Sequence, residues 1–127
     1  MSDGDARERA LRALYATDQG EGGSESGENL TGRAKRLYEG VVSEMDSLDA
    51  ALEAVSDKWR VDRMPAVDRN ILRLALYELR NETDTPHAVI ISEAVKHAKT
   101  YSTERSGGFI NGVLGRLASE ERSANGA

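Results

Sequence analysis

The stretch Pro65–Glu82 constrains the fold more than any other part of the chain, because its apolar residues cover most of a helix. Pro65 suits the first turn of a helix, where its missing N–H is not needed. At helical spacing the apolar residues form an arc wider than half the circumference. They are Val67, Ile71, Leu72, Leu74, Ala75, Leu76 and Leu79. A surface helix needs a narrower stripe, so we expect this helix to pack on two or more sides.

Two acidic residues, Asp68 and Glu78, interrupt this apolar arc. A buried carboxylate requires hydrogen bonds or a cation. We therefore expect Glu78 to cap a neighbouring helix or to pair with an arginine. Asp68 lies near the helix start, where a negative charge is favourable. Its alternative role is a contact with a partner protein.

The charge balance excludes some classes of function. The 127 residues fit one domain, and 17 basic against 22 acidic residues give a net charge of −5. This balance counts against a stand-alone, electrostatically driven nucleic-acid binder but allows a local basic patch. The chain has no cysteine, so disulfides and thiolate metal sites are excluded. We expect no cofactor and no metal. We also expect a cytoplasmic protein, since neither a signal peptide nor an apolar run of membrane length is present.

The rest of the chain is typical of an all-α domain, because each of its two prolines falls where a helix can begin. Besides 65–82, we expect helices over 6–18, 31–44, from Asp46 or Ser47 to about residue 57, from between Pro86 and Ser92 to about Tyr101, and over 106–118, with Ser106 as N-cap. We expect residues 1–5 to be disordered, 20–29 to form a flexible acidic loop, 119–127 to form a flexible tail, and Trp59 to anchor the core.

Three arginines lie within six residues of the first predicted helix. Arg9 and Arg12 face away from its apolar side, and Arg7 falls at the edge of that side, where its stem can pack while its head stays in water. Two interpretations remain open. The arginines either contact phosphates or form an ordinary solvated face.

Two long motifs carry a resemblance to a known family. RNILRLALYEL, followed by SEAVKHAKTYSTERSGGFINGVLG, resembles the C-terminal signature of the NusB family of bacterial transcription antitermination factors. ARERALRALYATD resembles the first helix of that family. The resemblance extends over about residues 6 to 118, which is nearly the whole chain.

The resemblance implies a single domain of two packed helical bundles, 6–57 and 65–118, with about six to seven helices. It implies a protein that pairs with a NusE-type small-subunit ribosomal protein and binds the boxA element of nascent ribosomal RNA. Together with NusA and NusG, the pair helps RNA polymerase ignore terminators. It also implies that the chain catalyses no reaction. Monomers and homodimers both occur in such a family, so the oligomeric state stays open.

The resemblance also assigns candidate site residues. The family's arginine-rich RNA contact matches Arg7 and Arg9, with Arg12 nearby, and its aromatic positions match Tyr101 and Phe109. Its partner-facing tyrosine matches Tyr15, and its partner-facing acid matches Asp68. Arg69 and Arg105 are further candidates for phosphate contacts.

The chain departs from the family pattern at two places. Family members often carry a longer arginine cluster before the first helix, whereas this chain begins MSDGDARER. Arg105 stands where the family often has an acid, so it either adds a phosphate contact or is a solvated loop residue.

Two other functions compete with antitermination. NusB-like domains also occur in ribosomal RNA cytosine methyltransferases, but that activity needs a cofactor-binding domain for which we expect no room in 127 residues. A helical bundle that binds only proteins is compatible with the acidic net charge. RNA binding measured with and without the partner discriminates between these possibilities.

Overall fold

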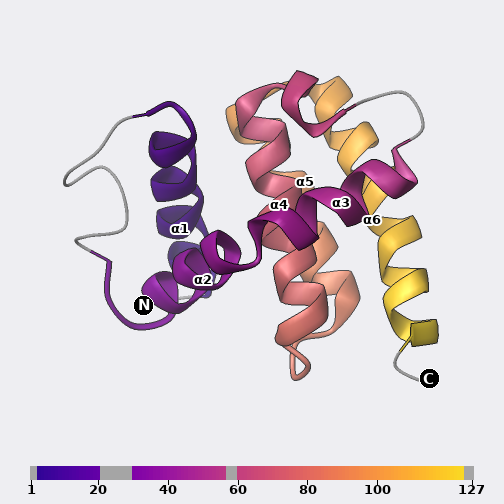
Figure 1. The fold of residues 1–127 in the computed structure, drawn as a ribbon, viewed down its shortest axis with the longest axis horizontal. Coiled ribbons are helices and arrows are strands. Elements are labelled where there is room, and N and C mark those ends of the chain that lie inside the picture. The colour runs from indigo at the N-terminus through magenta and orange to yellow at the C-terminus, as the bar shows by residue number, and fades with distance from the viewer. Residues whose placement is uncertain (1–2, 21–29, 57–59, 125–127) are drawn as a thin grey trace.

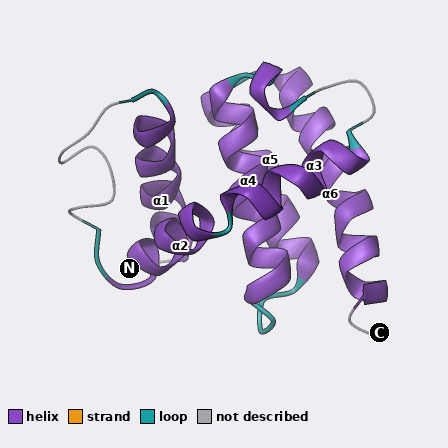
Figure 2. Cartoon of the chain, in the orientation of Figure 1, coloured by secondary structure: helices purple, strands orange, loops and turns teal. Residues whose placement is uncertain are grey.

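The structure is a computed structural model, and it describes residues 3–20, 30–56 and 60–124. Within these ranges the chain is helical and contains no strand (Figure 2). The elements are α1 (Asp3–Asp18), α2 (Gly32–Ser43), α3 (Met45–Val55), the short 3-10 helix η3 (Val61–Arg63), α4 (Ala66–Asn81), α5 (His87–Tyr101) and α6 (Glu104–Ala124). The predicted all-α fold is confirmed.

Helix α4 lies at the centre of the molecule, with α1 and α2 on one side and α6 on the other (Figure 1). It packs against all five other α-helices. Nine of its sixteen residues are buried, including Leu72, Leu74 and Leu76. The broad apolar arc of the sequence therefore faces protein on several sides, as predicted for Pro65–Glu82.

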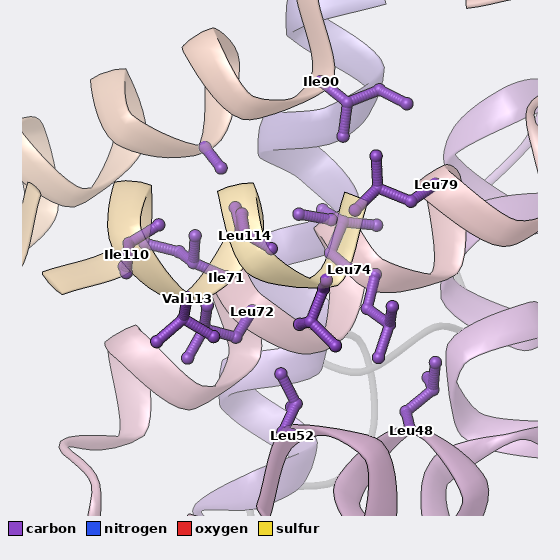
Figure 3. Close-up of a cluster of buried hydrophobic side chains, with 14 of the residues drawn as sticks. Leu48, Leu52, Ile71, Leu72, Leu74, Leu79, Ile90, Ile110, Val113 and Leu114 are labelled. Carbon is purple, nitrogen blue, oxygen red and sulfur yellow. The ribbon is translucent and has the colours of Figure 1, made fainter. Parts of the chain in front are cut away.

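The main core forms where the five other α-helices converge on α4. Leu48 and Leu52 reach it from α3, Ile90 from α5, and Ile110 and Leu114 from α6 (Figure 3). All five side chains are at most 1% exposed. Burial of a leucine or isoleucine side chain contributes about 1.5–3 kcal/mol, so this convergence supplies much of the driving force for folding.

The N-terminal helices α1 and α2 share a small apolar cluster that is separate from the main core. It contains Ala6, Ala13, Leu30 and Ala34. Helix α3, which the two-bundle division groups with α1 and α2, packs mainly against α4 and α6.

Gly40 permits the close approach of α2 to α4. A Cβ atom at this position would overlap the ring of Tyr77, because its distance to Cζ would be far below a van der Waals contact.

Several predicted boundaries are wrong. Residues 3–5, expected to be disordered, belong to α1, and residues 119–124 of the expected tail continue α6 to Ala124. The sequence ASEER contains good helix formers, which explains the extension. Ser106 lies inside α6 instead of capping it: its N–H donates to the hydroxyl of Thr103 at 3.0 Å. Trp59, most of the acidic loop and residues 125–127 lie outside the described residues.

Candidate functional site

Arg7 does not belong to an exposed basic patch. Its Nε donates to both carboxylate oxygens of Glu78, at 2.9 and 3.1 Å, and the two side chains are only 4% and 2% exposed. Arg33 donates to the same carboxylate at 3.1 Å. The expectation that the Arg7 head stays in water is wrong, and the predicted pairing of Glu78 with an arginine is confirmed.

In the Arg7–Glu78 pair, the buried carboxylate of Glu78 is surrounded by the two arginines instead of by water. Burial raises the pKa of Glu78, while the charges and hydrogen bonds of Arg7 and Arg33 act in the opposite direction. Because its guanidinium is enclosed between α1 and α4, Arg7 cannot reach an RNA phosphate in this conformation. Its role is to hold the first helix on the central one.

Arg69 is likewise engaged within the protein. Its Nε and Nη2 donate to the carboxylate of Asp18 at 2.7 and 2.5 Å, and its Nη1 donates to the carbonyl of Met64 at 3.2 Å. The hydrogen bonds that Asp18 accepts from Arg69 and, to a smaller extent, from Asn70 lower the pKa of Asp18. The guanidinium thus ties the end of α1 to the start of α4, and the structure gives no support to a phosphate contact by Arg69.

The Asp18–Arg69 pair also has a consequence for the predicted partner residues. Tyr15 lies one helical turn before Asp18 and is 40% exposed, while Asp68 immediately precedes Arg69. The ion pair therefore holds the helix ends that carry Tyr15 and Asp68 together.

Asp68 lies in a surface hollow between the start of α4 and the start of α6. The hollow has a volume of about 410 Å³ and is lined by Met64, Pro65, Asp68, Thr103, Arg105, Ser106 and Phe109. Asp68 is only 3% exposed. Its Oδ2 accepts a hydrogen bond from Ser106 at 2.9 Å, whereas its Oδ1 has no partner among the described residues.

An unsatisfied buried carboxylate oxygen is costly unless a ligand completes its hydrogen bonds. The hollow is lined by Asp68 together with apolar side chains from Met64, Pro65 and Phe109. Such an arrangement fits a long basic side chain, whose stem packs on the walls while its head meets the carboxylate. Arg105 is exposed at this hollow, and Phe109 is partly buried there.

A second candidate surface lies where α1 passes the end of α5. Arg12 is exposed, and its Cζ lies 6.0 Å from the centre of the Tyr101 ring, within range of a cation–π contact. Tyr101 is 38% exposed. Arg9, on the same helix, is partly exposed and has an interaction of its own within the protein. The structure therefore brings Arg12 and Tyr101 together at the surface.

Glu8 is a residue of this surface that sequence reasoning missed. It accepts a hydrogen bond from the hydroxyl of Tyr101 and another from Nη2 of Arg12 at 3.1 Å. The spacing of four residues between Glu8 and Arg12 is visible in the sequence. The contact with Tyr101, 93 residues away, has no sequence signal.

Comparison with known proteins decides the family. The NusB family model matches residues 4–119, almost the whole chain. The chain belongs to the NusB family. It is accordingly a transcription antitermination factor of the NusB type.

Individual relatives match the sequence of this chain over most of their length. The NusB protein of Anaeromyxobacter dehalogenans strain 2CP-1 is 44% identical, with 90% of this chain and 88% of the relative covered. The NusB protein of Pelotomaculum thermopropionicum is 41% identical, with 92% and 89% covered.

Solved structures show the same fold. T. maritima NusB superposes with a TM-score of 0.84 at 33% identity, covering 94% of this chain and 92% of that one. A chain from a crystal structure of the antitermination factors NusB and NusE in complex with dsRNA gives a TM-score of 0.80 at 29% identity, covering 92% and 96%.

A membrane-spanning helix and a metal-binding cluster are both absent from the described part of the chain. No helix there is long and apolar enough to cross a membrane. The same residues contain no group of three or more His, Cys, Asp or Glu side chains that is able to hold a metal ion.

Proposed function

We propose that this NusB-family chain forms a heterodimer with a NusE-type small-subunit ribosomal protein and binds boxA RNA of nascent ribosomal RNA transcripts. Working in the cytoplasm with NusA and NusG, the pair helps RNA polymerase pass terminators. The observation that carries the proposal is the buried Asp68, which lines an apolar-walled hollow and whose Oδ1 has no partner among the described residues.

The partner surface is the hollow together with the nearby end of α1. A lysine or arginine of the ribosomal protein enters the hollow and donates to Asp68, since a desolvated carboxylate selects a cation. Tyr15 adds an exposed ring to the same surface. The solved neighbour that contains NusB, NusE and dsRNA supports this type of partner.

The RNA surface is formed by the exposed side of α1 and the end of α5. Arg9 and Arg12 supply positive charge, and Tyr101 offers a ring on which an unpaired base stacks. Arg105 and Phe109 lie at the hollow that receives the partner. In this proposal they contact RNA only where the RNA surface borders the partner surface. We leave Arg7 and Arg69 out of the RNA surface because both are held in ion pairs inside the protein.

A gel shift of boxA RNA with the purified chain, the ribosomal protein from the same organism, and both together tests the proposal. We expect weak binding by the chain alone and tighter binding by the pair. Arg12→Ala should weaken binding to all RNAs. It should also make the negative slope of log affinity against log salt shallower by up to about one unit.

Arg60→Ala is the matched control, because the Arg60 side chain is 71% exposed and lies outside both proposed surfaces. It should leave the slope unchanged. Formation of the heterodimer without any RNA binding would favour a bundle that binds only proteins, and no heterodimer would contradict the partner half of the proposal.

A further inference from the structure

The exposed donors of the proposed RNA surface already have an anionic partner. The carboxylate of Glu8 accepts hydrogen bonds from the hydroxyl of Tyr101 and from Nη2 of Arg12, with both bonds on the same oxygen, Oε1. The Arg12 guanidinium also lies beside the Tyr101 ring. Glu8 therefore holds a cation and an aromatic hydroxyl in one cluster between α1 and α5.

A carboxylate and a phosphate compete for the same kind of donor. Both are anions that accept charge-assisted hydrogen bonds from guanidinium and hydroxyl groups. The hydrogen bond from Tyr101, followed by the charge of Arg12, lowers the pKa of Glu8, so its side chain is ionised at neutral pH. An RNA phosphate that approaches Arg12 therefore comes close to this negative charge.

We propose that Glu8 is a built-in competitor of the RNA backbone, which occupies Arg12 and Tyr101 in the free protein and is displaced when RNA binds. The proposal rests on the RNA-binding function proposed above. Displacement is feasible because the cluster lies at the surface: the side chains of Glu8 and Arg12 are 36% and 70% exposed. Exposed ion pairs of this kind are weak, so a polyanion is able to replace one.

This competition makes Glu8 a determinant of affinity. An RNA backbone that displaces it gains Arg12 and Tyr101 together. Glu8 also lowers the effective number of phosphate contacts that the free surface offers.

Glu8→Gln tests the proposal, because it removes the charge and keeps the shape. The affinity for boxA RNA and for a uridine dodecamer is measured against salt concentration, with the ribosomal protein present. We expect binding of both RNAs to tighten by about three- to tenfold at about 50 mM salt, with a salt slope steeper by up to about one unit. Thermal unfolding of the variant is followed in parallel to show that the fold is kept.

Two further variants separate local competition from net charge. Glu120→Gln makes the same charge change on the C-terminal part of α6, which lies across the molecule from α1 (Figure 1), and it should change affinity much less. In an Arg12→Ala background, Glu8→Gln should have a smaller effect than in the wild type, because the masked cation is gone.

The outcomes are distinct. Unchanged or weaker RNA binding by Glu8→Gln overturns the proposal, as does an equal gain from Glu120→Gln, which would mean a general charge effect. An absence of RNA binding by every variant, the wild type included, would instead contradict the RNA-binding function itself.

Discussion

Arg7 and Glu78, 71 residues apart in the sequence, form a buried ion pair that fastens the first helix to the central one. Both side chains are almost fully enclosed, so neither charge has water as an alternative partner. Removal of one member leaves the other charged and buried, which costs far more than the loss of an exposed pair.

Arg7→Ala should therefore lower the free energy of unfolding by about 3–5 kcal/mol, as measured by urea denaturation. Arg33 still contacts Glu78, which favours the lower end of this range. Arg12→Ala, on the exposed side of the same helix, should cost less than about 1 kcal/mol. Equal effects from the two variants would contradict the structural role of Arg7.

The Asp18–Arg69 pair predicts a dependence of stability on pH. The pKa of Asp18 is lowered in the folded protein, below its ordinary value of 3.8. Above that value Asp18 contributes its full stabilisation, and the contribution is lost as the pH falls through the folded-state pKa. Asp18→Asn should destabilise the protein at pH 7 and make its stability less sensitive to acid.

Urea titrations of wild type and Asp18→Asn at neutral and acidic pH provide the measurement. The difference between the two proteins should be larger at neutral pH. Glu39→Gln is a suitable control, because Glu39 is exposed on α2. A constant difference between wild type and Asp18→Asn over the whole pH range would show that the pair does not titrate as described.

Asp68→Asn should weaken binding of the NusE-type protein at least about tenfold, because the amide removes the charge that a basic side chain needs. The oxygen of the new amide is still able to accept the hydrogen bond from Ser106, so the fold should be kept. The burial of Asp68 makes this change more informative than an arginine, which would not fit between the helices. Calorimetry with the purified partner measures the affinity, and an unchanged value would remove Asp68 from the partner surface.

Gly40→Ala and Gly112→Ala should change stability in opposite directions. Alanine in a helix is normally about 0.5–1 kcal/mol better than glycine, and a Cβ atom added at Gly112 would have nothing within 4 Å. At Gly40 the new methyl group meets the Tyr77 ring, so overpacking should cost about 1–3 kcal/mol. Thermal melts of the two variants test the close approach of α2 to α4 directly.

The fold was largely predictable from the sequence, because helix periodicity is a local property. The apolar arc of Pro65–Glu82 correctly indicated the central helix, and an acid on that arc correctly indicated a buried partner for Glu78. The helix ends were less predictable. Residues 3–5 and 119–124 are mostly polar, and polarity alone does not distinguish an exposed helical turn from a tail.

The candidate site was harder to predict, because its contacts join distant residues. The sequence places Arg7 at the edge of an apolar face but does not show that Glu78 is opposite it. In the sequence, Arg69 looks like any other surface cation. Only the fold shows that the end of α1 brings Asp18 within hydrogen-bonding distance of it. Tyr15, Asp68, Arg12 and Tyr101 remain proposed contacts, and the structure supports them only by exposure or by an unsatisfied polar atom.

The hollow at Asp68 has a thermodynamic consequence of its own. It is assembled from α4 and α6, through a hydrogen bond between residues 38 positions apart, so it exists only in the folded chain. A partner that enters it binds the native state and not the unfolded one, and at a free concentration of about one hundred times its dissociation constant it adds about 2.7 kcal/mol to the free energy of unfolding. Under the proposed partnership, the lifetime of this small protein in the cell depends on the supply of free ribosomal protein.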